Sequence, residues 1–215
     1  MYVKIKLSRI QSVCQCWLLN VNQRKKQALE TREKLISVGI DLFGSQGYSS
    51  TSAEQIVSAA KVTRGALYHH FNGGKLGLFE AAVERMQQRL VHELRENASL
   101  VKSEWGSIRS VFSAFFEFAL NTEYRVIALQ DAPSILGVER WREIEYDYSV
   151  AFIVRALESL MKNGVINDVS IEPIASLIFG ASCEAALLIA ASDNKIDATQ
   201  EALDALELLM SGLKK

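Results

Sequence analysis

The sequence predicts an all-α protein of about nine helices, divided into a smaller N-terminal domain and a larger C-terminal one. Apolar residues recur at helical spacing along almost the whole chain, and no stretch shows the sustained alternation that is typical of strands. Apolar residues make up 49% of the 215 residues, and only 2 prolines occur. This composition favours a compact, helix-rich chain over a disordered one.

The first helix is expected between about residues 24 and 43, with Gly44 and Gly47 ending it. Residues 1–23 are expected to precede it as a loose extension. Their apolar patch is interrupted by polar residues and no small-residue cleavage site follows it, so we expect no signal peptide.

A tight pair of short helices is expected next. Ser52 and Gln55 have the spacing of a capping box, which predicts a helix over about 52–60. Only two residues separate it from Thr63, a favourable N-cap residue for a second short helix. Because two helices across a short turn form a helix-turn-helix, residues 24–80 are interpreted as one domain.

A long helix over about 75–97 is expected to join the two domains, because an Asn-Gly-Gly sequence at 72–74 stops the helix before it. The second domain, residues 81–215, should contain about five further helices. Their breaks are expected at Gly106, 121–125, 133–137, 163–167 and 192–196.

The segment 174–191 is apolar enough to need a membrane test. It is 18 residues long and carries a single charge, Glu184. A carboxylate in the middle of a membrane span is costly, and neither flank has the basic cluster that would orient a span. We therefore expect a helix buried between other helices.

Charge is distributed unevenly between the two halves. Residues 1–97 carry 14 Lys and Arg against 8 Asp and Glu, whereas residues 98–215 carry 10 against 17. A basic first half suggests an anionic partner, most often a nucleic acid. The three cysteines are too few and too scattered for a disulfide framework, which favours a cytoplasmic protein.

The stretch TRGALYHHF at 63–71 could indicate a metal site, a catalytic cluster or a contact surface. His69 and His70 are adjacent, so they point about 100° apart on a helix and chelate one ion poorly. No Cys, Asp or Glu lies between 61 and 77, and no nucleophile stands beside a His–carboxylate pair. We therefore expect no metal, no cofactor and no catalytic site here.

Core packing explains only part of this stretch. Leu67 and Phe71 are four residues apart and should be buried together, which turns the rest of the helix outward. Gly65 costs about 1 kcal/mol relative to alanine inside a helix. A glycine here permits close approach of another backbone, such as a DNA strand in whose major groove the helix lies.

At this point the chain resembles a known family. The first domain, over about 31–79, is similar to the DNA-binding domain of TetR-type transcriptional regulators. The matching positions are Ile36, Leu42, Phe43, Gly47, Tyr48, Thr51, Ile56, Ala60, Val62, the stretch 63–71, Lys75, Leu78 and Phe79. Two departures occur: Lys61 stands where the family usually has glycine in the turn, and Lys75 lies one residue further from Phe71 than is usual.

The resemblance implies roles for individual residues. Thr51 and Ser52 are expected to touch phosphate at the start of the first short helix. Arg64, Gly65 and Ala66 are expected to face base edges. The remaining contacts, to the DNA backbone, are expected from Tyr68, His69, His70 and Lys75. For His70, a half-buried position at the helix end is an open alternative.

The second domain is expected to hold an effector pocket and a dimer interface. The family uses an apolar pocket here, and the crowded aromatic residues suggest one lined by Met86, Leu90, Trp105, Phe112, Phe115, Phe116, Leu129, Trp141, Tyr148 and Phe152. The last two helices are apolar on several sides, and their expected dimer contacts are Ala175, Gly180, Ala185, Leu203, Leu206 and Met210.

The resemblance thus implies a homodimeric transcriptional regulator, most often a repressor, that a small-molecule effector releases from a palindromic DNA operator. Two other classes stay open at this stage: a small helical enzyme that contains a similar hairpin, and a helical adaptor without a role in DNA binding. Salt-dependent binding to DNA would separate them.

Overall fold

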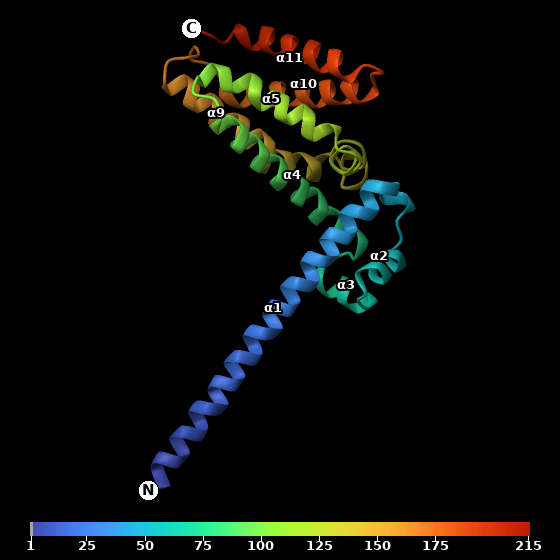
Figure 1. The fold of residues 1–215 in the computed structure, drawn as a ribbon, viewed down its shortest axis with the longest axis vertical. Coiled ribbons are helices and arrows are strands. Elements are labelled where there is room, and N and C mark those ends of the chain that lie inside the picture. The colour runs from blue at the N-terminus through green and yellow to red at the C-terminus, as the bar shows by residue number, and fades with distance from the viewer. Residues whose placement is uncertain (1) are drawn as a thin grey trace.

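The computed structural model describes the backbone of residues 2–215 and the side chains of residues 23–103 and 105–215. Over this range the chain is helical, apart from turns and one isolated bridge between Ile166 and Lys214. When helical segments that follow one another without a break are joined, the described chain forms nine continuous helices, which confirms the expected all-α class and helix number. Figure 1 shows the small domain of α1–α3 at one end of α4, and the stacked helices α5 and α9–α11 at the other.

Helix α1 is longer than the sequence suggested. It runs from Tyr2 to Ser50, so the backbone before residue 24 is helical and projects from the body of the molecule (Figure 1), and the expectation that residues 1–23 form an extension stays a prediction. Gly44 does not end the helix. A Cβ added there would lie 2.9 Å from Cα of Glu123, so this glycine allows the second domain to approach closely. Gly47, with φ of 78°, kinks the helix near its end.

Helices α2 (Ala53–Ala60) and α3 (Arg64–His70) form as the capping signals predicted. Ser52 and Gln55 make both bonds of the capping box, and the hydroxyl of Thr63 accepts a hydrogen bond from the backbone N–H of Ala66. Lys61 ends α2 in the left-handed region, with φ of 52°. The turn therefore takes the conformation for which the family uses glycine, here with a lysine.

Helix α4 (Lys75–Ser99) belongs to both domains. Its first turns are held by an aromatic cluster, in which the ring of Phe79 lies 5.2 Å from that of Phe43 and 4.9 Å from that of Tyr48. Further along, Leu90 and Leu94 are buried in the second domain. A displacement of α4 in one domain therefore also displaces residues that pack against it in the other domain.

The second domain consists of α5 (Glu104–Leu120), α6 (Thr122–Tyr124), the π-helical segment η1 (Arg125–Asp131), α7 (Ala132–Ile135), α8 (Val138–Glu145), the π-helical segment η2 (Tyr146–Val150), α9 (Ala151–Lys162), α10 (Ile171–Ala191) and α11 (Lys195–Ser211). The expected break at Gly106 is wrong: this residue lies in the first turn of α5, where its N–H donates to the N-cap Ser103. The other expected breaks coincide with helix ends or junctions.

Helix α10 is less buried than expected. Within the described residues it is the one helix that is long and apolar enough to cross a membrane, and only 28% of its apolar window is buried. Leu177 and Leu188 are exposed by 74% and 63%. The expected burial between other helices is therefore found on one side of α10 only, and its other apolar face has no partner within the described chain.

Candidate DNA interface and effector cavity

Helix α3 is buried on one side and open on the other. Leu67 and Phe71 belong to the core of the first domain, as their spacing predicted. Arg64, Gly65 and Tyr68 are exposed on the opposite side, together with His69. The exposed face is short and polar, and it begins at a capped helix N-terminus, where backbone N–H groups lack partners within the helix.

Arg64 is held at this face by two neighbours. Its Nη1 lies 2.6 Å from Oε1 of Glu54 on α2, and its guanidinium stacks 5.7 Å from the ring centre of Tyr68. Tyr68 and then Glu54 raise the pKa of Arg64, so the side chain is always cationic. Because both partners of the ion pair are largely exposed, the pair contributes little stability, and the guanidinium can exchange Glu54 for a base edge.

Gly65 has free space where a side chain would be. The nearest heavy atom to an added Cβ is Oγ1 of Thr63 at 3.9 Å, so packing inside the protein does not require a glycine. The backbone of α3 is therefore bare on its outer face. Ala66 follows it half-buried, and the helix presents little bulk at this point.

Thr51 does not face solvent, which contradicts the expected phosphate contact. Its side chain is only 2% exposed, and its hydroxyl donates to the carbonyl oxygen of Gly47 at 2.8 Å and accepts from Nε2 of Gln46 at 3.1 Å. It closes the kinked end of α1. Ser52 is exposed at the start of α2, where its hydroxyl caps the helix, so the phosphate contact expected there stays a prediction.

Lys75 is also turned inward, against the expectation that it binds the DNA backbone. Its Nζ donates to the carbonyl oxygens of Tyr48 and Thr51, at 2.9 and 2.8 Å, and lies 3.8 Å from the ring centre of Tyr48. Burial lowers the pKa of this amine. The ammonium group thus satisfies one carbonyl in the last turn of α1 and one just beyond the helix, a role that the extra residue before Lys75 does not prevent.

Replacing Lys75 with alanine should therefore change stability rather than DNA contacts. We expect the free energy of unfolding to fall by roughly 1–3 kcal/mol, because two hydrogen bonds from a charged donor are lost. The salt dependence of DNA binding should stay the same, which fluorescence anisotropy in a salt series would measure. Lys61→Ala, which removes an exposed lysine of the turn, is the matched variant. A salt slope lowered by about one unit in Lys75→Ala would restore a phosphate contact.

His70 takes the half-buried position that was left open. Burial, the neighbouring His69 and then Arg32 lower its pKa. Its ring lies 5.2 Å from that of His69, which is exposed. His69 and Tyr68 therefore remain predicted backbone contacts, whereas His70 is half-buried at the end of α3, beside Phe71.

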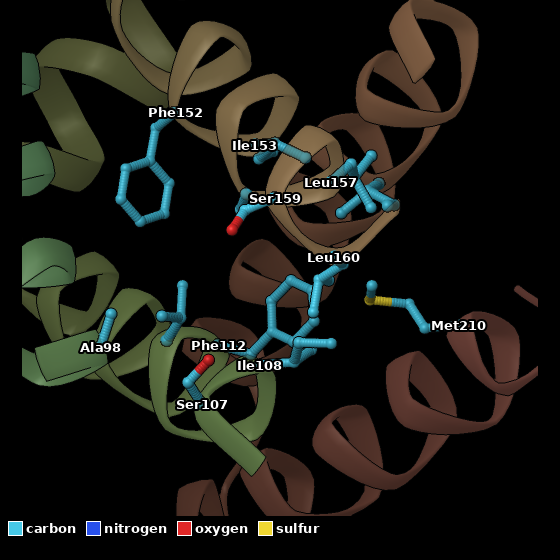
Figure 2. A pocket seen from close by; sticks show the side chains of 13 residues that line it. Ala98, Ser107, Ile108, Phe112, Phe152, Ile153, Leu157, Ser159, Leu160 and Met210 are labelled. Carbon is cyan, nitrogen blue, oxygen red and sulfur yellow. The ribbon is translucent and has the colours of Figure 1, made fainter. Parts of the chain in front are cut away.

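An apolar cavity among α5, α9 and α10, called the main cavity below, has a volume of about 210 Å³; the groove between α10 and α11 is larger but lies at the surface. Its described lining is apolar except for Ser107 of α5 and Ser159 of α9, whose hydroxyls are drawn in Figure 2. The other lining residues are Ala98, Ile108, Val111, Phe112, Phe152, Ile153, Ala156, Leu157, Leu160, Ile178 and Met210. A smaller void of about 30 Å³ adjoins it and shares four of these residues: Val111, Phe112, Phe152 and Ile153.

The predicted pocket residues fall into three groups. Phe112 and Phe152 line both spaces, and Leu90 and Phe115 line the smaller one. The others line neither space, which corrects their predicted role. Met86 and Phe116 are buried core residues, and the partly buried ones that pack against the core are Trp105, Leu129, Trp141 and Tyr148.

The predicted dimer residues need a similar correction. Ala175, Leu203 and Met210 are buried inside the protomer, so they cannot form its outer surface, whereas Leu206 is 4% exposed and lines the floor of the groove between α10 and α11. Gly180 is exposed and Ala185 is half-buried. The exposed apolar side chains of α10 and α11 are instead Leu177, Leu188, Ile196, Leu208 and Leu209. Leu188 and Leu209 lie in a groove of about 460 Å³ between the two helices.

The two domains also meet away from α4. The backbone N–H of Tyr48 donates to Oδ2 of Asp131 at 2.7 Å, next to the kink at Gly47. This carboxylate comes from the π-helical segment η1. The end of α1, which carries one of the carbonyls bound by Lys75, is therefore attached directly to the second domain.

Comparison with known proteins identifies relatives for both domains. The family model described as "Bacterial regulatory proteins, tetR family" matches residues 35–82, and that described as "Tetracyclin repressor-like, C-terminal domain" matches residues 105–213. The solved structure of a TetR-family transcriptional regulator from Pectobacterium atrosepticum is 33% identical, with a TM-score of 0.72, and the match covers 88% of this chain and 96% of that one.

Two curated proteins are similar over shorter lengths. The transposon Tn10 TetC protein of Escherichia coli is 22% identical over 161 residues, which are 75% of this chain and 81% of that protein. The HTH-type transcriptional regulator AcrR of Shigella flexneri is 34% identical over 107 residues, and the match covers 49% of each protein.

Proposed function

The chain belongs to the TetR family of bacterial regulatory proteins, and from this premise we propose that it represses transcription as a homodimer on a palindromic operator. A small-molecule effector that enters the second domain releases it from the DNA. The protein acts in the cytoplasm, where the operator is. Its relatives are transcriptional regulators and not enzymes, so the proposal assigns it no catalytic residue.

The observation that carries this proposal is the exposed face of α3. Arg64 offers a guanidinium that can donate two hydrogen bonds to a guanine. Gly65 lets the helix backbone approach the groove, and Tyr68 and His69 flank it with hydrogen-bonding groups. In a two-fold symmetric dimer, two such faces read half-sites about one DNA turn apart.

Replacing Gly65 with alanine tests this role, because the effects on folding and on DNA binding should have opposite signs. The free protein should gain up to about 1 kcal/mol of stability, since alanine favours a helix and the added methyl group meets no neighbour. Operator affinity should fall, because the methyl group lies where DNA approaches. Urea denaturation and fluorescence anisotropy measure the two quantities.

Unrelated DNA of equal length serves as the control for this variant. Its weak binding rests on phosphate contacts and should change less than operator binding. An operator affinity equal to that of the wild type would show that the backbone of α3 does not lie against DNA, and the proposed reading face would be wrong.

Effector release is proposed to act through the contacts that join the domains. Effector binding changes DNA affinity only if the effector binds two conformations differently. The cavity lies among α5, α9 and α10; α5 packs against α4, and so does η2, which continues directly into α9. A ligand that moves α4 or the η1 carboxylate Asp131 would alter the position of α3, and with it the spacing of the two half-sites.

A further inference from the structure

A buried polar cluster lies behind the smaller void. Nε2 of Gln87 on α4 donates to Oε1 of Glu145 on α8 at 2.6 Å, and Oγ of Ser149 on η2 donates to Oε1 of Gln87 at 2.8 Å. All three side chains are at most 5% exposed. Trp141, Glu145 and Ser149 follow one another at four-residue intervals, so they share one face of the continuous helix α8–η2.

Three polar atoms of this region are buried without a well-aligned hydrogen bond: Oη of Tyr124, Nε1 of Trp141 and Oε2 of Glu145. Trp141 lies close enough to Glu145 to lower the pKa of that carboxyl group, and Gln87 lies close enough to Tyr124 to lower the pKa of that hydroxyl, so these neighbours offset part of the cost of burial. Buried polar atoms are nearly always paired, so three such atoms in one region require an explanation. Glu145 also forms no ion pair with any described Lys or Arg side chain. A buried carboxyl group without a cation is unfavourable to ionise.

The cluster borders the effector cavity through two residues. Ser149 lines the smaller void, and so does Phe179, whose ring packs 6.4 Å from that of Trp141. The void has the volume of about one water molecule, and it shares the rings of Phe112 and Phe152 with the main cavity. A ligand that fills the main cavity and passes these two rings would therefore reach Ser149.

The charged and ionisable groups around Ser149 indicate which functional group of a ligand fits the smaller void. The described lining of both spaces contains no charged side chain, and the ionisable group connected to Ser149, through Gln87, is the Glu145 carboxyl group. An anion would find no counter-charge in this lining. A cation would find aromatic rings and a carboxyl group that can ionise, both of which can stabilise it.

We propose that the effector is an organic cation: an apolar body occupies the main cavity, and a protonated amine enters the smaller void beside Ser149, where Glu145 neutralises it. The proposal rests on the proposed function and specifies the chemistry of its effector. Burial holds the Glu145 carboxyl group in its neutral form near neutral pH. Binding of a cation therefore ionises Glu145 and releases its proton, because the charged pair replaces a neutral acid.

The experiment uses three probes of matched shape, 4-phenylbutylamine, 4-phenylbutan-1-ol and 4-phenylbutyrate, in isothermal titration calorimetry with the DNA-free protein at pH 6.5. We expect the amine to bind about tenfold or more tightly than the alcohol, and the anion to bind least. Titration in buffers of different ionisation enthalpy should show release of about one proton per amine bound.

The variant Glu145→Gln keeps the shape and an acceptor for Gln87 but removes the charge. In it the amine should lose its advantage over the alcohol, and proton release should vanish. Glu139→Gln removes an exposed carboxylate from the same helix and should behave as the wild type. If Glu145→Gln does not fold, the number of protons released per amine bound to the wild type tests the proposal on its own.

Three outcomes would overturn the proposal: no probe binds, the alcohol binds as tightly as the amine without proton release, or the anion binds most tightly. Because these titrations contain no DNA, they test the effector site separately from repression. A mobility shift on operator DNA without any probe tests the regulatory function, so failure of one can be told from failure of the other.

Discussion

Replacing Leu188 with glutamate is expected to convert the proposed dimer into a folded monomer that no longer binds its operator specifically. Leu188 is 63% exposed in the protomer and lines the groove between α10 and α11, which Glu184 and Glu201 also border. Two-fold symmetry would place two new carboxylates in the interface. A buried, unpaired charge costs several kcal/mol, so the dimer should separate.

The loss of DNA binding follows from the geometry of the operator. A monomer reaches only one half-site, and specific affinity should fall by about a thousandfold or more toward the nonspecific level. Light scattering after size exclusion measures the mass, and anisotropy measures binding. Leu100→Glu, at a residue that is 78% exposed at the end of α4, is the matched control and should remain dimeric. A dimer that persists in Leu188→Glu would place the interface elsewhere.

This test also shows where reasoning from sequence stops. Helical spacing marks α10 and α11 as apolar on more than one side, and it cannot say which side faces the protomer and which faces solvent. Leu206 and Leu188 are equally apolar in sequence, yet only Leu188 is exposed. The choice depends on how α5 and α9 pack against the pair, which is a property of the whole fold.

Local signals, by contrast, predicted the first domain well. The capping box at Ser52 and the cap at Thr63 each involve residues within a few positions of one another. The inward turn of Lys75 was not predictable in this way. Its partners, the carbonyls of Tyr48 and Thr51, lie 27 and 24 residues earlier, and only the folded kink of α1 brings them to the amine.

The buried polar cluster left a signal in the sequence that was not used. Gln87 interrupts the buried stripe of α4 between Met86 and Leu90, and Glu145 is a buried polar residue that follows the buried Ile144 at the end of α8. A polar residue at an expected core position indicates either a satisfied hydrogen bond or a ligand contact. The pairing of Gln87 with Glu145 across 58 residues required the structure.

Glu145 should also control how stability depends on pH. Burial raises its pKa from 4.5 to about 8, so the folded protein keeps this proton over a range in which the unfolded chain has lost it. Between about pH 4.5 and pH 8, unfolding therefore releases a proton, and the free energy of unfolding contributed by this group falls as pH rises. The stabilisation that this proton contributes is complete below about pH 4.5, decreases as the pH rises, and is lost above about pH 8.

In Glu145→Gln the amide cannot ionise, so this pH dependence should disappear. The variant and the wild type should have similar stability near pH 5, and at pH 9 the variant should be more stable by about 3–5 kcal/mol, from about 1.4 kcal/mol for each unit of pKa shift.

Other titratable groups do not disturb this comparison. Burial raises the pKa values of Tyr124 and Cys183, which face Glu145, so both stay neutral between pH 5 and pH 9. His70, whose pKa is lowered, contributes the opposite slope in both proteins and cancels in the difference. Urea denaturation at pH 5, 7 and 9 measures this difference, with Glu139→Gln as the control. If the free energy of unfolding changed with pH equally in Glu145→Gln and the wild type, Glu145 would already be ionised in the folded protein. A partner outside the cluster would then have to stabilise its charge.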